Sequence, residues 1–181
     1  MYSDIDPGEI LGLKTLIAGE VNTGKTRLSL DILSALLESG RKDIAVIDCA
    51  PEPIGGVGGA LRPPGGSGVL LLKAAVKAPR LLGRDDRETL ELAQGNARRI
   101  EKLFEAFRRS PREILFINDV SLYLHAGELE RVLEVLDLSR TSVINAYYGS
   151  SFPDSTLSRR EHKIVERLMG LVDRVIMLGG A

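Results

Sequence analysis

The central motif of this sequence is Gly19-Glu20-Val21-Asn22-Thr23-Gly24-Lys25-Thr26. It matches the pattern G-x-x-x-x-G-K-[S/T] at every constrained position. The apolar run at 13–18 predicts a buried strand before the motif, and residues 26–38 have the pattern of a helix after it. A glycine-containing turn between a strand and a helix is the context in which this pattern binds phosphate. We therefore expect the chain to bind a nucleotide.

Each residue type in this turn suits a triphosphate. Backbone N–H groups at a helix N-terminus attract phosphate oxygens, and glycine lets the backbone curl closely around them. We expect Lys25 to reach the β and γ phosphates and Thr26 to offer its hydroxyl to Mg²⁺, which prefers oxygen ligands. The residues predicted to bind the nucleotide are Gly19, Glu20, Val21, Asn22, Thr23, Gly24, Lys25, Thr26 and Arg27.

Length and composition limit the possible partners. A chain of 181 residues fits one domain, so we expect 1–181 to form a single nucleotide-binding domain. The net charge of -1 gives no electrostatic reason to expect nucleic acid or an anionic membrane. The only cysteine, Cys49, excludes an internal disulfide, and no apolar run is long enough for a signal peptide or a membrane span. These features predict a cytoplasmic protein with no membrane association.

Strand and helix patterns alternate along the chain, which predicts an α/β fold in three layers, with a mostly parallel sheet of five to six strands and helices on both faces. Two pairs of residues have the spacing of helix caps, Asp85 with Glu88 and Ser158 with Glu161. The expected strands are 13–18, 44–47, 69–76, 114–117, 142–146 and 174–178, and the expected helices are 26–38, 87–109, 128–138 and 158–170.

This order of elements resembles the P-loop NTPase superfamily, in which the first motif is called Walker A. Residues 114–119, Ile-Leu-Phe-Ile-Asn-Asp, resemble its Walker B strand, a hydrophobic run that brings an acid to the edge of the sheet. The resemblance implies that Asp119 holds Mg²⁺, through a water or on the hydroxyl of Thr26. From the residues alone, Asp119 could also begin a turn. Many similar ATPases have Glu next, whereas Val120 follows here, so fast hydrolysis is not expected.

Asp48 ends the second predicted strand. In P-loop kinases, which this arrangement also resembles, an acid at this place can accept the proton of the acceptor hydroxyl. The residues that follow, Pro51, Gly55 and Gly56, are loosely similar to those of RNA 5′-hydroxyl polynucleotide kinases. Asp48 could instead cap a turn or contact Mg²⁺ through water.

Residues 51–68 are rich in glycine and proline and predict a long mobile loop at the same edge of the sheet. Long loops in compact domains often cover a substrate. Arg62 and, beyond the loop, Arg80 could contact a phosphate when the loop closes, or could be solvated.

Polar and aromatic residues end the strand predicted at 142–146. In RecA-like ATPases, which the order of elements also resembles, a polar residue here senses the γ-phosphate, and Asn145 has this place. Asn145 could equally satisfy backbone groups at the strand end. At most one of Tyr147 and Tyr148 is expected in the core, and the other could stack on a base or pack on the next loop.

The last predicted helix opens with a basic segment, residues 158–163. An arginine from it could enter the site of this chain or of a neighbouring subunit, or the segment could be a solvated face balanced by Glu161 and Glu166. His125 and His162 are too few and too far apart to predict a metal site. Glu128 is expected to be a surface acid.

Together these features predict a Mg²⁺-dependent nucleotide-binding protein, most simply an ATPase, with catalytic residues Lys25, Asp119, Asp48 and Asn145. ATP is preferred to GTP because the chain lacks the Asn-Lys-x-Asp segment that reads guanine in the G-protein branch. One alternative is a kinase that transfers the γ-phosphate to a small-molecule or RNA hydroxyl, with Asp48 as base. Another is a nucleotide-dependent switch or assembly subunit with little hydrolysis, which acts with a protein partner or as an oligomer.

Overall fold

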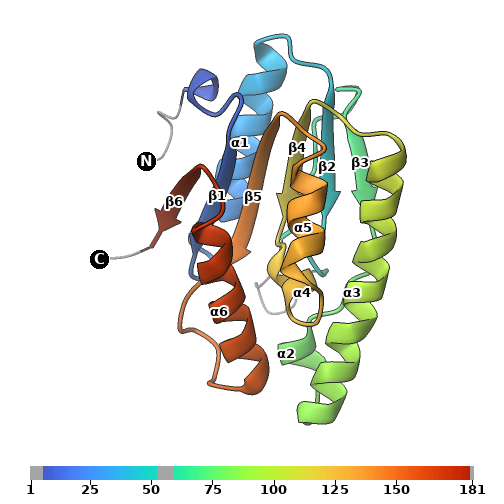
Figure 1. Ribbon diagram of the computed structural model, residues 1–181, viewed down its shortest axis with the longest axis vertical. Coiled ribbons are helices and arrows are strands. Elements are labelled where there is room, and N and C mark those ends of the chain that lie inside the picture. The colour runs from blue at the N-terminus through green and yellow to red at the C-terminus, as the bar shows by residue number, and fades with distance from the viewer. Residues whose placement is uncertain (1–5, 53–58, 180–181) are drawn as a thin grey trace.

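A computed structural model describes residues 6–52 and 59–179. Its centre is a six-stranded sheet in the order β3-β2-β4-β5-β1-β6 (Figure 1). All of the strand pairings are parallel. The strands are β1 (Lys14–Gly19), β2 (Ile44–Asp48), β3 (Leu70–Lys73), β4 (Ile114–Asn118), β5 (Thr141–Tyr147) and β6 (Arg174–Leu178).

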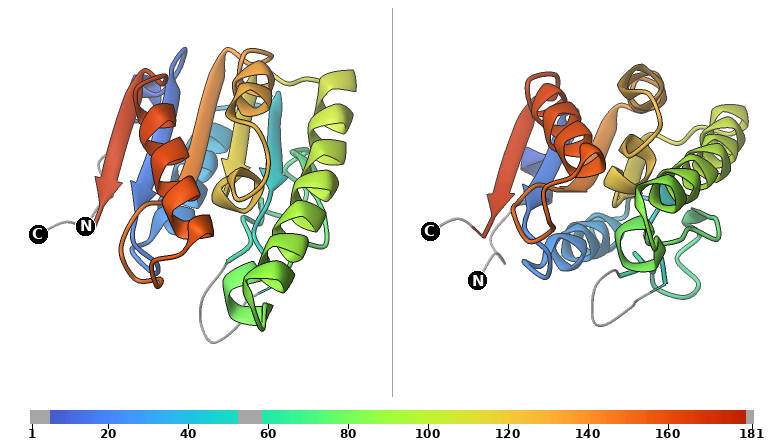
Figure 2. Two further views of the ribbon diagram at one scale, coloured as in Figure 1. Left: turned by 60° about the horizontal axis from the view of Figure 1, so that its bottom comes forward. Right: turned by 90° about the horizontal axis from the view of Figure 1, so that it is seen from below.

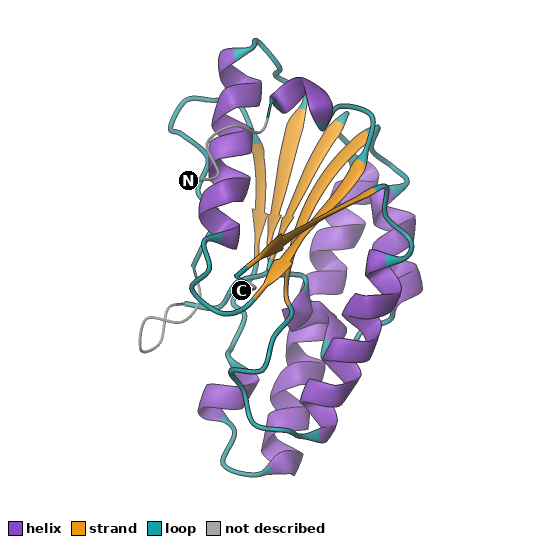
Figure 3. Ribbon diagram, turned by 90° about the vertical axis from the view of Figure 1, so that its left-hand side faces the viewer, coloured by secondary structure: helices purple, strands orange, loops and turns teal. Residues whose placement is uncertain are grey.

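Helices cover both faces of this sheet (Figure 3). One face is covered by α1 (Lys25–Glu38), with the 3-10 turn η1 (Pro7–Glu9) beside it. The other face is covered by α3 (Asp86–Arg109), α5 (Leu129–Leu136) and α6 (Thr156–Met169). Two short helices, α2 (Pro79–Leu82) and α4 (Ser121–Leu124), lie near the carboxyl ends of the strands, an edge that Figure 2 shows from below.

The four inner strands, β1, β2, β4 and β5, are buried because each contributes to a core on both faces. In β1, Leu16 and Ala18 join the core under α3, α5 and α6, whereas Ile17 joins the core under α1. Alternate side chains of a strand point to opposite faces, so a strand covered on both sides has a continuous apolar sequence. This arrangement confirms the predicted α/β class and parallel sheet.

The predicted elements agree with the structure apart from their ends and one cap. The strand expected at 69–76 is shorter, Leu70–Lys73. Asp85 caps α3 by accepting a hydrogen bond from the Glu88 backbone at 2.8 Å, as predicted. The predicted pair of Ser158 and Glu161 is wrong. Ser155 caps α6 instead, through the backbone N–H of Ser158 at 3.1 Å.

The predicted mobile loop at 51–68 is described only in part, because residues 53–58 lie outside the described residues. Leu61, in the described part, is buried in the core beside α1, and Arg62 is exposed. The solvated alternative for Arg62 therefore agrees with its position.

The cap of α3 can be tested by substitution. Asp85→Ala should lower the free energy of unfolding by about 1 kcal/mol, because it leaves a backbone N–H of the first turn without its partner. Urea denaturation measures the change. Asp85→Asn, which can still cap, should be close to wild type, and an equal loss in both variants would contradict the capping role.

Candidate nucleotide-binding site

The loop between β1 and α1 has the backbone shape that a phosphate-binding turn requires. Gly24 has a φ of 91°, a left-handed conformation that favours glycine, and it immediately precedes the first residue of α1. At Gly19 the constraint is contact, since a Cβ there would lie 2.0 Å from the carbonyl oxygen of Leu178 in β6. We call this turn, residues 19–26, the phosphate loop.

Lys25 is held within the phosphate loop. Its Nζ donates hydrogen bonds to the carbonyl oxygens of Gly19, at 2.9 Å, and of Glu20. Burial lowers the pKa of Lys25, while the charges of Asp119, Glu20 and Glu161 oppose that shift. The ammonium group is therefore pre-positioned among groups that an anionic ligand could replace.

Asn118, the last residue of β4, connects the phosphate loop to the sheet. Its side-chain oxygen accepts hydrogen bonds from the Thr26 hydroxyl at 3.2 Å and from Asn145 Nδ2 at 2.8 Å. Its Nδ2 donates to Asp48 Oδ1 at 2.8 Å. Thr26 thus contacts Asn118 directly, whereas direct contact with Asp119 is one of the two arrangements that the Walker B resemblance implies. Asn118 was not among the predicted site residues, although it directly precedes Asp119 in the sequence.

Asp119 lies directly after β4, with a φ of 55° that is uncommon for a residue with a side chain. Its backbone N–H donates to Asn145 Oδ1 at 2.7 Å. Burial, with a further contribution from the charge of Glu161, raises the pKa of Asp119 to about 7, although the charge of Lys25 acts in the opposite direction. An acid of this pKa can exchange a proton near neutral pH.

Lys25, Thr26 and Asp119 line one pocket of about 340 Å³. Asn145 lines it too, whereas Asp48 is not among the described residues that do. Asp48 is 1% exposed; one carboxylate oxygen accepts from Asn118, and the other lies 3.8 Å from Lys73 Nζ. The structure thus brings Lys25, Thr26, Asp119 and Asn145 together and leaves Asp48 behind Asn118.

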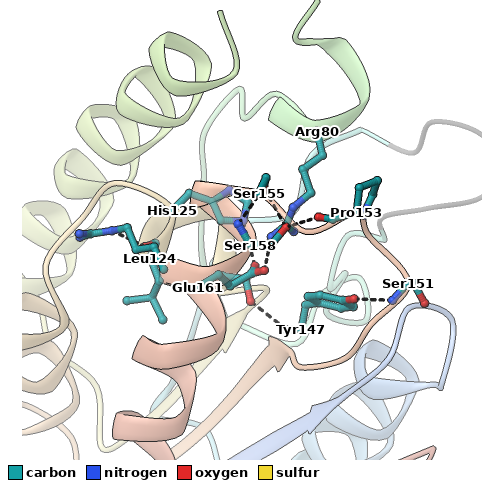
Figure 4. Close-up of polar contacts among 11 residues, drawn as sticks. Arg80, Leu124, His125, Tyr147, Ser151, Pro153, Ser155, Ser158 and Glu161 are labelled. Carbon is teal, nitrogen blue, oxygen red and sulfur yellow. Dashed lines mark hydrogen bonds and ion pairs between the residues drawn. The ribbon is translucent and has the colours of Figure 1, made fainter. Parts of the chain in front are cut away.

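Arg80, His125, Tyr147, Phe152 and Glu161 form a second wall of the pocket. Figure 4 shows the polar contacts of Arg80, His125, Tyr147 and Glu161. Glu161 is 1% exposed and binds both Arg80 and His125, so it does not balance the basic segment on the surface of α6. This buried role explains why Glu161 does not pair with Ser158 in a cap. The pairing of Glu161 with Arg80 and His125 could not be predicted from the sequence, because both of those residues belong to distant segments of the chain.

The arginines that open α6 make contacts elsewhere. Arg159 pairs with Asp154 at 2.6 Å, and Arg160 donates to the carbonyl of Gly127 at 2.8 Å and lies 3.7 Å from Glu128. Neither arginine lines the pocket within the described part of the chain. Glu128 is exposed, as predicted.

The loop after β5 is tied to the phosphate loop. The Glu20 carboxylate accepts hydrogen bonds from the backbone of Ser150 and from the hydroxyls of Ser150 and Ser151. The Ser150 backbone bond, followed by the Ser151 hydroxyl, lowers the pKa of Glu20 to about 2. Tyr147 packs on the same loop, since its hydroxyl accepts from the Ser151 N–H at 2.9 Å.

Comparisons with known proteins support the fold. No family model and no curated protein matches the chain. Among solved structures, the flagellar accessory protein FlaH of Methanocaldococcus jannaschii is similar over 92% of this chain and 71% of its own, with a TM-score of 0.54 and 11% identity. An ATPase from the type III secretion system of pathogenic bacteria has a TM-score of 0.50 and 14% identity, over 93% of this chain and 51% of its own.

The chain has a P-loop NTPase fold. It spans about half the length of the secretion ATPase. The Pif1 helicase of Candida albicans also matches, at 19% identity over 92% of this chain and 36% of its own, but its TM-score of 0.40 is too low to support any further comparison. Identities this low show a shared fold alone.

Two kinds of feature are absent from the described residues. None of the helices there combines the length and apolar character needed to cross a bilayer. Within the same residues, no group of three or more His, Cys, Asp or Glu side chains is arranged to hold a metal ion.

Stability should depend on the charge of Asp119. The pKa of the Asp119 carboxyl is about 7 in the folded state, compared with an ordinary value of 3.8. The folded state therefore binds the proton more tightly than the unfolded chain does. The resulting contribution to the free energy of unfolding is complete below about pH 4 and is lost as the pH rises through 7. Asp119→Asn cannot ionise. Without nucleotide, its thermal midpoint should exceed that of wild type at pH 8, and the difference should shrink at pH 5.

The exposed Asp154 provides the control for this experiment. Asp154→Asn should change the midpoint by the same small amount at both pH values. A difference between Asp119→Asn and wild type that did not vary with pH would contradict the raised pKa.

Proposed function

We propose that this protein binds ATP with Mg²⁺ at the phosphate loop and hydrolyses it slowly. One observation carries the proposal: Lys25, Thr26 and Asp119 line the same pocket at the carboxyl edge of the sheet. Ligands of open α/β folds bind at this edge. ATP is proposed over GTP because the chain has no Asn-Lys-x-Asp segment.

The phosphates would be held by the loop and by Lys25. Backbone N–H groups at the start of α1 attract anions, and Lys25 is poised to exchange its carbonyl partners for phosphate oxygens. The hydroxyl of Thr26 and the side-chain oxygen of Asn118 fit Mg²⁺ by their chemistry. When bound, Mg²⁺ would offset negative charge on the β and γ phosphates.

Asp119 is proposed to orient the attacking water and accept its proton. The hydrogen bond from Thr26 to Asn118 supports matching the acid of the Walker B strand to Asn118, one residue before Asp119. Asn118 then stands where similar ATPases have the acid that contacts this hydroxyl, and Asp119 stands where many have Glu. With a pKa of about 7, Asp119 can accept a proton at neutral pH.

A switch or assembly role is the second candidate. The contacts of Glu20 with Ser150 and Ser151 favour it, since a nucleotide that rearranged the phosphate loop would act on the loop after β5. Such a role would involve a protein partner or an oligomer. The kinase alternative is less well supported, because Asp48 is bonded to Asn118 behind the pocket.

Loss of the loop lysine should weaken nucleotide binding. Lys25→Ala removes charge-assisted hydrogen bonds to phosphate, so affinity for Mg-ATP should fall about 10- to 100-fold in a calorimetric titration. Lys42→Ala, at an exposed lysine outside the pocket, is the control and should bind like wild type. Equal affinities of Lys25→Ala and wild type would reject the phosphate loop as the binding site.

Substitution of Asp119 should slow the hydrolysis of ATP much more than it weakens the binding of Mg-ATP. Asp119→Asn keeps the size of the side chain but removes the proton acceptor, so phosphate release should slow about 100-fold or more while Mg-ATP affinity changes much less. The Lys25→Ala preparation gives the background rate. A normal rate in Asp119→Asn would assign the base elsewhere.

A further inference from the structure

Arg80 occupies the wall of the pocket formed by α2 and α6, and it has no part in the function proposed above. Its side chain is 12% exposed and pairs through Nη2 with Glu161. Glu161 in turn lies 2.9 Å from His125 Nε2. Arg80, His125 and Glu161 therefore form a connected polar cluster, which Figure 4 shows beside Tyr147.

The hydrogen bonding of this cluster is incomplete. Arg80 Nε and His125 Nδ1 are both buried and have no hydrogen-bond partner among the described residues. A guanidinium carries five N–H donors, and one carboxylate contact leaves others for a second acceptor. A buried donor without a partner costs free energy, which an anionic ligand in the pocket would recover.

The guanidinium is also held in place. Its Cζ lies 4.6 Å from the centre of the Phe152 ring and 5.6 Å from that of Tyr147, within the range of cation–π contacts. The backbone leading to Arg80 is fixed by the buried Asn96, whose amide bonds both the N–H of Lys77 at 3.0 Å and its carbonyl at 2.7 Å. Little entropy would be lost when this arginine meets a ligand.

The charges of the pocket favour an anion between Lys25 and Arg80. Burial tends to raise the pKa of Glu161, but His125 and Arg80 outweigh it and leave that pKa below its usual value. Glu161 is therefore a carboxylate that holds Arg80 in position. The Glu161 carboxylate does not accept hydrogen bonds from all of the Arg80 donors, since Arg80 Nε has no partner among the described residues. Lys25 is a second cation that lines the same pocket.

We propose that Arg80 binds the terminal phosphate of the nucleoside triphosphate and so makes the site prefer a triphosphate over a diphosphate. This inference rests on the function proposed above. A planar guanidinium can hold a carboxylate on one side and phosphate oxygens on another, so the pair with Glu161 remains intact. The phosphate loop would hold the β-phosphate of a diphosphate, so we expect Arg80 to add affinity only when a γ-phosphate follows it.

The test measures the affinities of two nucleotides by calorimetry in the presence of Mg²⁺. The nucleotides are ADP and a non-hydrolysable ATP analogue. In Arg80→Gln, affinity for the analogue should fall about 10- to 100-fold, whereas affinity for ADP should stay within about twofold of wild type. Arg84→Gln, at an exposed arginine just beyond α2, is the matched control and should alter neither affinity.

Two results would overturn the inference. Equal losses for both nucleotides in Arg80→Gln would give Arg80 a purely structural role, and unchanged affinities would remove it from the phosphate site. If Arg80→Gln does not fold because Glu161 loses its partner, the double variant Arg80→Gln/Glu161→Gln removes both charges and is compared in the same way. A wild-type protein that binds neither nucleotide would instead reject the proposed function itself.

Discussion

A single buried amide joins the elements that make up the candidate site. Asn118 accepts hydrogen bonds from Thr26 at the start of α1 and from Asn145 in β5, and it donates to Asp48 in β2. It also donates to the carbonyl of Gly59 at 2.8 Å. Each of these groups is costly to leave unpaired away from water, so the amide holds three strands and the phosphate loop in one arrangement.

A neutral side chain suits this central position. A carboxylate here would face Asp48, whose carboxylate is 2.8 Å from Asn118 Nδ2, and would accept hydrogen bonds but donate none. The amide does both, so it can bond to Thr26 and Asp48 together. The negative charge of the site is displaced to Asp119, where burial makes ionisation unfavourable and brings the pKa to about 7. Structural and proposed chemical roles are thus divided between adjacent residues.

The strands and the phosphate loop could be predicted from the sequence, because the patterns that mark them are local. Strands such as β4 are buried on both faces and have continuous apolar sequences, and the φ of 91° at Gly24 requires a glycine at that point in the motif. The second wall of the pocket could not be predicted in this way. Arg80 and Glu161 are 81 positions apart in the sequence, and only the folded chain brings them together. In the sequence, Glu161 has the spacing of a capping residue at the start of a helix.

The contact between Glu20 and the loop after β5 has a mechanical consequence. With a pKa of about 2, the Glu20 carboxylate keeps its charge at any pH that the folded protein would ordinarily meet. Acidification therefore does not release this tether. Ser150 and Ser151 separate from Glu20 when the Glu20 side chain rotates or either loop moves, so the contact between the two loops responds to their positions and not to protons.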